Sequence, residues 1–209
     1  MKPFNDYNQI VIFDVETSGL SSKEASIIEL GAIIVKPLLG EFVIEEEVSV
    51  LINIKQKLPD EIIKLTNITD EMLKTGISEE ELFKIMKKLT MPNTLLIAYN
   101  LPFDYGFFKA LFYKYEGHSK SLDQCDFLDM LTCYRAKHAY PHKLDHAVAM
   151  YEVSVPNTHR ALDDVLATYE LFLKMHKAYN LEPFINVIGV LKKYPYQKMK
   201  LSKIKTITQ

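Results

Sequence analysis

Three apolar runs rich in β-branched residues fill much of the first 52 positions of this chain, at 9–14, 26–35 and 42–52. Their spacing predicts three consecutive strands joined as a meander. A shorter apolar run at 94–100 predicts a fully buried strand. Because strands come first and then alternate with helical segments, the pattern favours an α/β domain built on a mixed sheet.

The helices are predicted from their start signals and their periodicity. Ser78 and Glu81 have capping-box spacing ahead of an amphipathic segment. Pro59 with the acidic residues after it signals another helix start, and Pro102 stands in the first turn of a helix expected to run to about Tyr115. A short strand and a helix are expected in DFLDMLTCYRAK, and further helices in KLDHAVAMYEV and ALDDVLATYELFLKMHKAY.

Length and composition indicate one globular domain with a short appendage. The chain has 209 residues, 48% of them hydrophobic, and its two cysteines are too few for a disulfide scaffold. No apolar run reaches 18 residues, so we expect a soluble, cytoplasmic protein without a membrane partner. The net charge of −2 gives no indication of nucleic-acid binding.

The end of the chain differs in charge from the rest. We expect a catalytic domain over 1–180 and a basic extension of unknown role over 181–209. No acidic residue follows Glu182, and the extension carries six lysines. They are Lys192, Lys193, Lys198, Lys200, Lys203 and Lys205. Such a tail can contact phosphate or a partner protein, but it is more often a solvated end.

Two carboxylates close the first predicted strand. Asp14 and Glu16 lie two positions apart, so their side chains point to the same side of the strand. Like charges at that distance repel each other, and burial increases the cost. The pair is tolerable if solvent reaches it or if a hard divalent ion such as Mg²⁺ or Mn²⁺ lies between the oxygens. A strand that simply ends in surface charges is the alternative.

A metal site needs further carboxylates, and two later segments offer them. Asp104 lies in the first turn of the helix after the strand 94–98, where the helix dipole favours an anion. In the last long helix, Asp163 shares a face with Glu170 and two lysines, which indicates solvent. Asp164 shares its face with small and apolar residues, and a carboxylate there is costly unless it is paired or metal-bound. The periodicity therefore selects Asp164.

His159 precedes that helix by about one turn. A histidine close to metal-binding carboxylates can act as a general base. A surface histidine at a loop–helix junction is the alternative.

Together these segments resemble the DEDD superfamily of 3′–5′ exonucleases in its histidine (DEDDh, DnaQ-like) branch. FDVETSGL, AYNLPFD and HRALDD resemble its three motifs, in the family's order and spacing. LPDEIIKLTNITDEM resembles a stretch of bacterial proofreading exonucleases, a subgroup that includes the epsilon subunit of DNA polymerase III. The resemblance covers roughly residues 9–175. It implies a ribonuclease H-like fold, a mixed five-stranded sheet flanked by helices.

The resemblance also implies roles for individual residues. Two divalent ions, Mg²⁺ or Mn²⁺, would be held by four carboxylates and would bracket the scissile phosphate, with His159 as the general base. These implied metal ligands are Asp14, Glu16, Asp104 and Asp164. The position of Thr17 holds the terminal nucleotide in the family, and the leucine at the position of Leu20 packs against a base. Asn100 and Phe103 would shape the pocket around the second motif.

Two positions depart from the family pattern. Tyr99 replaces the usual histidine before Asn100. Because that position is not a metal ligand, we expect an altered substrate contact rather than lost activity. Asn67 replaces the glycine of the LTGIT stretch, and asparagine tolerates a left-handed backbone better than most residues, so the turn should survive.

The implied function is metal-dependent hydrolysis of phosphodiester bonds from the 3′ end of single-stranded DNA, with release of nucleoside 5′-monophosphates. Such an enzyme would act in proofreading or repair, either alone or with a DNA polymerase as partner. An RNA-trimming exonuclease of the RNase T or oligoribonuclease type is the main alternative. A catalytically inactive module that binds nucleic acid or a polymerase is the other.

Overall fold

The predicted mixed sheet is the centre of the computed structural model, which describes residues 2–38, 40–155, 159–191, 199 and 201–209. Five strands pair in the order β3-β2-β1-β4-β5. The strands are β1 (Gln9–Thr17), β2 (Ile27–Leu38), β3 (Glu41–Leu51), β4 (Thr94–Ala98) and β5 (Asp126–Asp129). The first three form the expected antiparallel meander, whereas β4 and β5 run parallel to β1.

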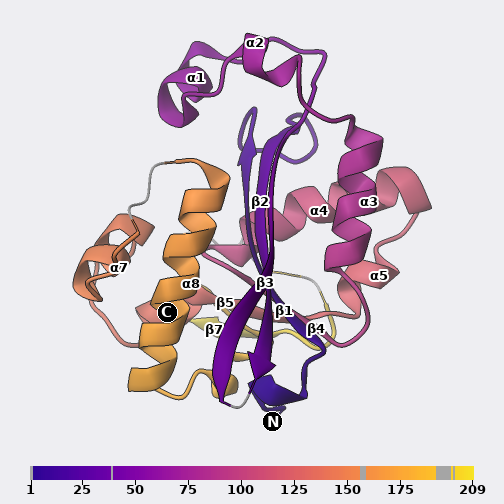
Figure 1. Cartoon of the computed structure of the whole chain (residues 1–209). Helices are drawn as coiled ribbons and strands as arrows, with labels where there is room; N and C mark the ends of the chain where they lie inside the picture. The colour runs from indigo at the N-terminus through magenta and orange to yellow at the C-terminus, as the bar shows by residue number, and fades with distance from the viewer. Residues whose placement is uncertain (1, 39, 156–158, 192–198, 200) are drawn as a thin grey trace.

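Helices cover both faces of this sheet. In Figure 1, α8 lies on one side of the strands and α3 and α4 lie on the other. The longer helices are α3 (Glu79–Leu89), α4 (Leu101–Glu116) and α8 (Ala161–Ala178). The shorter ones are α1 (Asp60–Thr66), α2 (Asp70–Leu73), α5 (Lys120–Asp123), α6 (Met130–Arg135) and α7 (Leu144–Met150). The α/β architecture and the predicted helices are therefore confirmed.

Alternation along β1 decides which residues meet which helix. Val11 and Phe13 join the core on the side of α3 and α4. Ile10 and Ile12 join the core formed with α8. Because strand residues alternate between faces, Asp14 continues the face of Ile10 and Ile12 toward α8.

Local start and stop signals act as the sequence predicts. Ser78 and Glu81 form the reciprocal capping box of α3. Asn67 ends α1 in the left-handed region, with φ 57° and ψ 14°, as expected for an asparagine that takes the place of glycine. The segment with α1 and α2 stands at the top of Figure 1, beyond one end of β2. A small separate core of Ile28, Leu58, Ile68 and Leu73 holds it there.

The first strand is longer than the predicted 9–14. It continues to Thr17 because Glu16 pairs with Glu29 and Thr17 with Ile27 of β2, across an irregularity between the two pairs. Asp14 and Glu16 therefore lie within the paired part of this strand rather than beyond its end.

The interpretation of the extension as a solvated end is wrong for the residues that the structure describes. β6 (Val187–Val190) and β7 (Lys205–Thr208) form a parallel pair. The side chains of Ile188, Val190 and Met199 are buried against the main core. The Gly189 N–H donates to the Thr132 hydroxyl over 2.7 Å. Lys192, Lys193, Lys198 and Lys200 lie outside the described residues.

Close contact between β2 and α8 depends on a glycine. A β-carbon at Gly31 would lie 2.4 Å from the carbonyl carbon of Ala161 and 2.5 Å from the backbone nitrogen of Leu162. These are backbone atoms at the start of α8, so they cannot move aside as a flexible side chain would. Gly31 therefore fixes how closely the first turn of α8 approaches the sheet.

Replacing Gly31 with alanine should lower the free energy of unfolding by about 2–3 kcal/mol, because the new methyl group overpacks the interface between β2 and α8. Thermal or urea unfolding measures the change. Gly106→Ala is the matched control, since its β-carbon would meet only the Ser22 hydroxyl at 3.7 Å. Because Gly106 lies within α4, its replacement with alanine should leave the free energy of unfolding unchanged or raise it by up to about 1 kcal/mol. Equal stability of both variants would contradict this packing account.

Candidate active site

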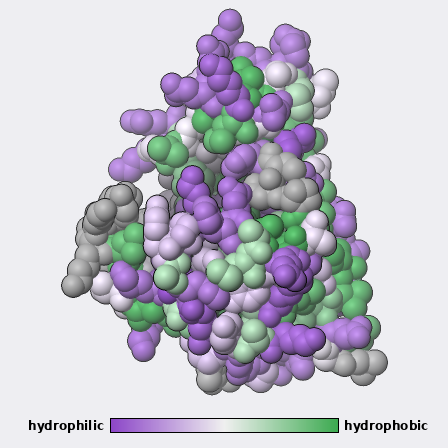
Figure 2. Space-filling view, turned by 90° about the vertical axis from the view of Figure 1, so that its left-hand side faces the viewer, coloured by the Kyte–Doolittle hydropathy of each residue, from purple (hydrophilic) through white to green (hydrophobic). Residues whose placement is uncertain are grey.

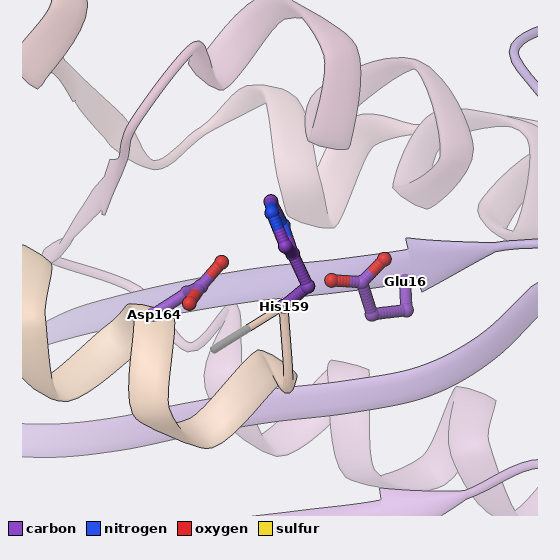
Figure 3. Close-up of side chains that lie close together, drawn as sticks. All are labelled: Glu16, His159 and Asp164. Carbon is purple, nitrogen blue, oxygen red and sulfur yellow. The ribbon is translucent and has the colours of Figure 1, made fainter. Parts of the chain in front are cut away.

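The strand β1 delivers two carboxylates to one end of the sheet. Asp14 and Glu16 are both half-buried. Strand alternation puts both side chains on the α8 face of the sheet, and Figure 3 shows Glu16 beside the start of α8. Their strand partners in β2 are Gly31 and Glu29. The small size of Gly31 leaves room for the first turn of α8 opposite Asp14, whereas Glu16 lies beside the side chain of Glu29.

The third carboxylate enters from the strand–helix turn after β4. Asn100 precedes α4 with φ 71° and ψ 44°, a left-handed conformation that asparagine accepts more readily than most residues. This turn brings Asp104 next to β1, where its Oδ1 accepts a hydrogen bond of 3.3 Å from the Val15 N–H. Asp104 is only 2% exposed. The same turn is fixed from β5, because Asp129 accepts a hydrogen bond from the Leu101 N–H.

The fourth carboxylate and the histidine come from the start of α8. Asp164 is 7% exposed and lies on the buried face of the helix with Ala161, Thr168 and Leu171, so the prediction of Asp164 over Asp163 agrees with its burial. His159 takes a left-handed conformation with φ 56° just before the helix. Figure 3 shows the side chains of Glu16, His159 and Asp164 gathered in one place. One donor atom from each lies within 4.8 Å of the others.

Crowding of carboxyl groups perturbs their acidity. Burial, followed by the charges of Asp164 and Glu29, raises the pKa of Asp14 from 3.8 to about 8. Burial and the charge of Asp14 raise the pKa of Glu16 from 4.5 to about 8. Burial and Asp14 also raise the pKa of Asp104 well above its usual range. Each carboxylate therefore makes ionisation of the next one more costly.

This donor set fits a divalent cation. Oxygen ligands from several carboxylates suit hard ions such as Mg²⁺ and Mn²⁺. A cation among Asp14, Glu16, Asp104 and Asp164 would also offset the repulsion that raises their pKa values. The charge distribution of the site thus favours metal binding over a purely structural cluster.

An ion pair between the buried Glu29 and the half-exposed Arg160 holds the first turn of α8 against the sheet. Glu29 on β2 is 1% exposed and accepts hydrogen bonds from Arg160, at 3.1 Å from Nε and 2.6 Å from Nη2. Its second oxygen accepts the Ala161 N–H at 3.0 Å. Because Arg160 lies between His159 and Asp164 in sequence, this pair fixes the segment that supplies both side chains.

Replacing Arg160 with glutamine should weaken divalent-metal affinity by about 10- to 100-fold, because Glu29 loses its guanidinium partner and the start of α8 loosens. Isothermal titration with Mn²⁺ measures the change. The control is Lys174→Gln, which breaks an exposed ion pair with Glu170 further along the same helix and should leave affinity unchanged. Unaltered Mn²⁺ affinity in the Arg160 variant would show that the pair does not organise the site.

The carboxylates and His159 line an open cleft of about 570 Å³. Its other lining residues are Val15, Leu65, Tyr99, Asn100, Phe103, Leu131, Arg135, His142, Lys143, Leu144 and Asp145. Figure 2 shows the side of the molecule that carries α7 and α8, with a largely hydrophilic surface below the segment of α1 and α2. The cleft is thus acidic where the four carboxylates lie and partly hydrophobic along its walls.

The structure brings eight of the ten predicted site residues to this cleft. The two others, Thr17 and Leu20, are not among its lining residues. Thr17 is buried, and its hydroxyl donates to the Gly19 carbonyl over 2.7 Å. The side chain of Leu20 is 89% exposed and contributes nothing to the cleft lining. Their predicted contacts with nucleotide and base stay predictions.

Tyr99 lines the cleft and also ties it to a neighbouring segment. Its hydroxyl donates to the backbone carbonyl of His142 over 2.7 Å. Sequence reasoning missed this segment, although Arg135, His142 and Lys143 all line the cleft. The only sequence signal was a local concentration of basic residues and histidines in YRAKHAYPHK.

Among the described residues, no helix has the length and hydrophobicity that a bilayer crossing requires.

Comparison with solved structures reveals the same architecture elsewhere. Exonuclease I of E. coli, solved in complex with a dT13 oligonucleotide, superposes with a TM-score of 0.69 and 20% identity, over 84% of this chain and 42% of that one. Exonuclease X, solved in complex with 5′ overhanging duplex DNA, gives a TM-score of 0.63 at 17% identity, over 84% of this chain and 96% of the other. These likenesses establish the ribonuclease H-like fold.

Sequence comparison identifies the family. The family model described as Exonuclease matches residues 11–172. The chain is 34% identical over 171 residues to DNA polymerase III PolC-type of Bacillus cereus, and 35% identical to that of Latilactobacillus sakei. It spans only 11% of the length of these relatives, while about 80% of this chain is aligned. The chain therefore belongs to the exonuclease family, as a DnaQ-like member.

Proposed function

We propose that this chain is a divalent-metal-dependent 3′–5′ exonuclease that removes nucleoside 5′-monophosphates from the 3′ end of single-stranded DNA. The convergence of four carboxylates and a histidine in one open cleft carries the proposal. The PolC-type relatives are named DNA polymerase III, which supports DNA as the substrate and a place beside a DNA polymerase. The resemblance of LPDEIIKLTNITDEM to proofreading exonucleases supports a role in proofreading.

The four carboxylates would hold the metal ions, which in such sites supply Lewis-acid stabilisation of a phosphate and a more acidic water. His159 lies close enough to Glu16 and Asp164 to accept the proton of an attacking water near the metal ligands. Phe103 and Tyr99 provide ring surfaces along the cleft on which a splayed terminal nucleotide can stack.

A digestion experiment tests the proposal. Single-stranded DNA and RNA of the same sequence, each labelled at either end, are incubated with the full chain and Mn²⁺ or with a chelator. We expect stepwise loss of mononucleotides from the 3′ end of DNA, and no release with the chelator. Faster digestion of RNA than of DNA would show that RNA, rather than DNA, is the substrate. Binding of DNA without any release in Mn²⁺ would instead support an inactive binding module.

A further inference from the structure

The cleft has a basic part that the metal chemistry does not use. Arg135 comes from the end of α6, and His142 and Lys143 come from the residues just before α7. These side chains share the cleft with Asp14, Glu16, Asp104 and Asp164. A site that only holds metal ions among carboxylates gains nothing from nearby cations, since they compete with the metal.

The charge of Arg135 acts on the buried carboxyl group of Asp129, but the Arg135 side chain still has a donor atom for a ligand. Its Nε atom is buried and has no hydrogen-bond partner in the part of the chain that the structure describes. Within the same residues, neither Arg135 nor Lys143 forms an ion pair, even though Asp145 lines the cleft beside them. A buried, unpaired guanidinium nitrogen costs free energy unless something binds it. Guanidinium groups bind phosphate with two parallel hydrogen bonds.

The segment that carries Lys143 is held in place by side chains behind it. Besides accepting from the Tyr99 hydroxyl, His142 makes a hydrogen bond of 3.0 Å from its Nε2 to the carbonyl of His138. The His138 ring in turn lies 2.7 Å from the hydroxyl of Tyr151. Tyr99 therefore connects the wall of the metal-binding part to the basic part of the cleft, and fixes the distance between them.

The chemistry of the proposed substrate says which group would bind there. In a 3′–5′ exonuclease, one nucleotide lies on the 3′ side of the scissile bond, and its 3′ end carries no phosphate. Any second phosphate in the cleft must therefore lie on the 5′ side. We propose that Arg135, with Lys143, binds a backbone phosphate on the 5′ side of the scissile linkage, and that Tyr99 is a positioning residue for this contact. This inference rests on the proposed function.

Binding of a fluorescent oligothymidylate, measured by anisotropy in Ca²⁺, tests the contact. Single linkages near the 3′ end are replaced in turn by uncharged methylphosphonates. We expect that neutralising one linkage on the 5′ side of the scissile bond weakens binding to the wild-type chain by about tenfold. Arg135→Gln should bind the unmodified strand about tenfold more weakly and should no longer respond to that linkage.

Three further variants separate the contact from general effects. Lys137→Gln removes a positive charge two residues away, outside the cleft lining, and should keep the wild-type linkage profile. Arg135→Lys keeps the positive charge but loses the planar guanidinium group, so its affinity for the strand should lie between those of the wild-type chain and Arg135→Gln. Tyr99→Phe keeps the ring but loses the hydrogen bond to His142, so KM should rise severalfold with kcat little changed. Thermal unfolding confirms that each variant folds.

The inference would be overturned if Arg135→Gln bound the unmodified strand as tightly as the wild-type chain and responded to the same linkage. If the wild-type chain then still releases mononucleotides, the proposed function stands on its own. If the wild-type chain degrades no strand, the proposed function fails, whereas the linkage profile still reports whether Arg135 binds a phosphate.

Discussion

An Asp14→Asn variant is expected to lose nucleotide release by about a thousandfold while becoming more stable in the absence of metal. The loss follows because Asp14 lies at the centre of the carboxylate cluster, and metal stabilisation of the reacting phosphate is worth several kcal/mol, about tenfold in rate per 1.36 kcal/mol. The gain in stability follows because asparagine is neutral without a proton, whereas the folded wild-type chain near pH 7 must keep on Asp14 a proton that the unfolded chain releases.

Release assays and thermal unfolding of the metal-free variant measure the two effects together. Asp163→Asn is the matched control, because it changes the neighbouring aspartate on α8, which does not line the cleft. It should retain most of the activity. A metal-free Asp14→Asn chain that is both inactive and less stable than wild type would mean that Asp14 is needed for folding rather than for holding a metal ion.

The stability of the metal-free chain is expected to fall by about 5 °C or more in melting temperature as pH rises from about 5 to about 8. Unfolded Asp14 and Glu16 ionise near their ordinary pKa values of 3.8 and 4.5, whereas the folded chain holds both protons up to about pH 8. Between these limits the folded state binds more protons than the unfolded state, so the free energy of unfolding decreases with pH. Mn²⁺ should restore stability most strongly near pH 8.

Histidines also titrate between pH 5 and 8, so the stability profile of the wild-type chain must be compared with that of a variant that keeps them. Burial lowers the pKa of His138 and of His176, which makes the folded chain more stable as pH rises through about 6.5. The Asp14→Asn variant keeps these histidines and should show a flatter decline. Identical pH profiles for the two proteins, with no response to Mn²⁺, would contradict the shifted carboxyl groups.

Much of the fold could be predicted because its elements carry local signals. The β-branched runs gave β1 to β4, and the Ser78–Glu81 pattern gave the start of α3. Asp164 could be selected over Asp163 from the helix sequence alone, because the helical period predicts which face is buried.

Contacts between distant segments could not be predicted from the sequence. The apolar residues of β6 stand among lysines in the sequence, and only their packing beside β5 and α6 shows that they belong to the core. Arg135 carries no motif, and its place in the cleft depends on the turn of the chain after β5. The Glu29–Arg160 pair joins residues 131 positions apart, so neither residue alone signals it.

The most direct test of the proposed metal centre is a count of the ions that the site binds. The metal-free chain is titrated with Mn²⁺ at pH 8 in the presence of a nucleoside 5′-monophosphate, and free Mn²⁺ is followed by electron paramagnetic resonance. We predict two bound ions per chain in the wild type and clearly weaker binding in Asp14→Asn. Absence of Mn²⁺ binding, or equal binding by both proteins, would contradict a metal centre built from these four carboxylates.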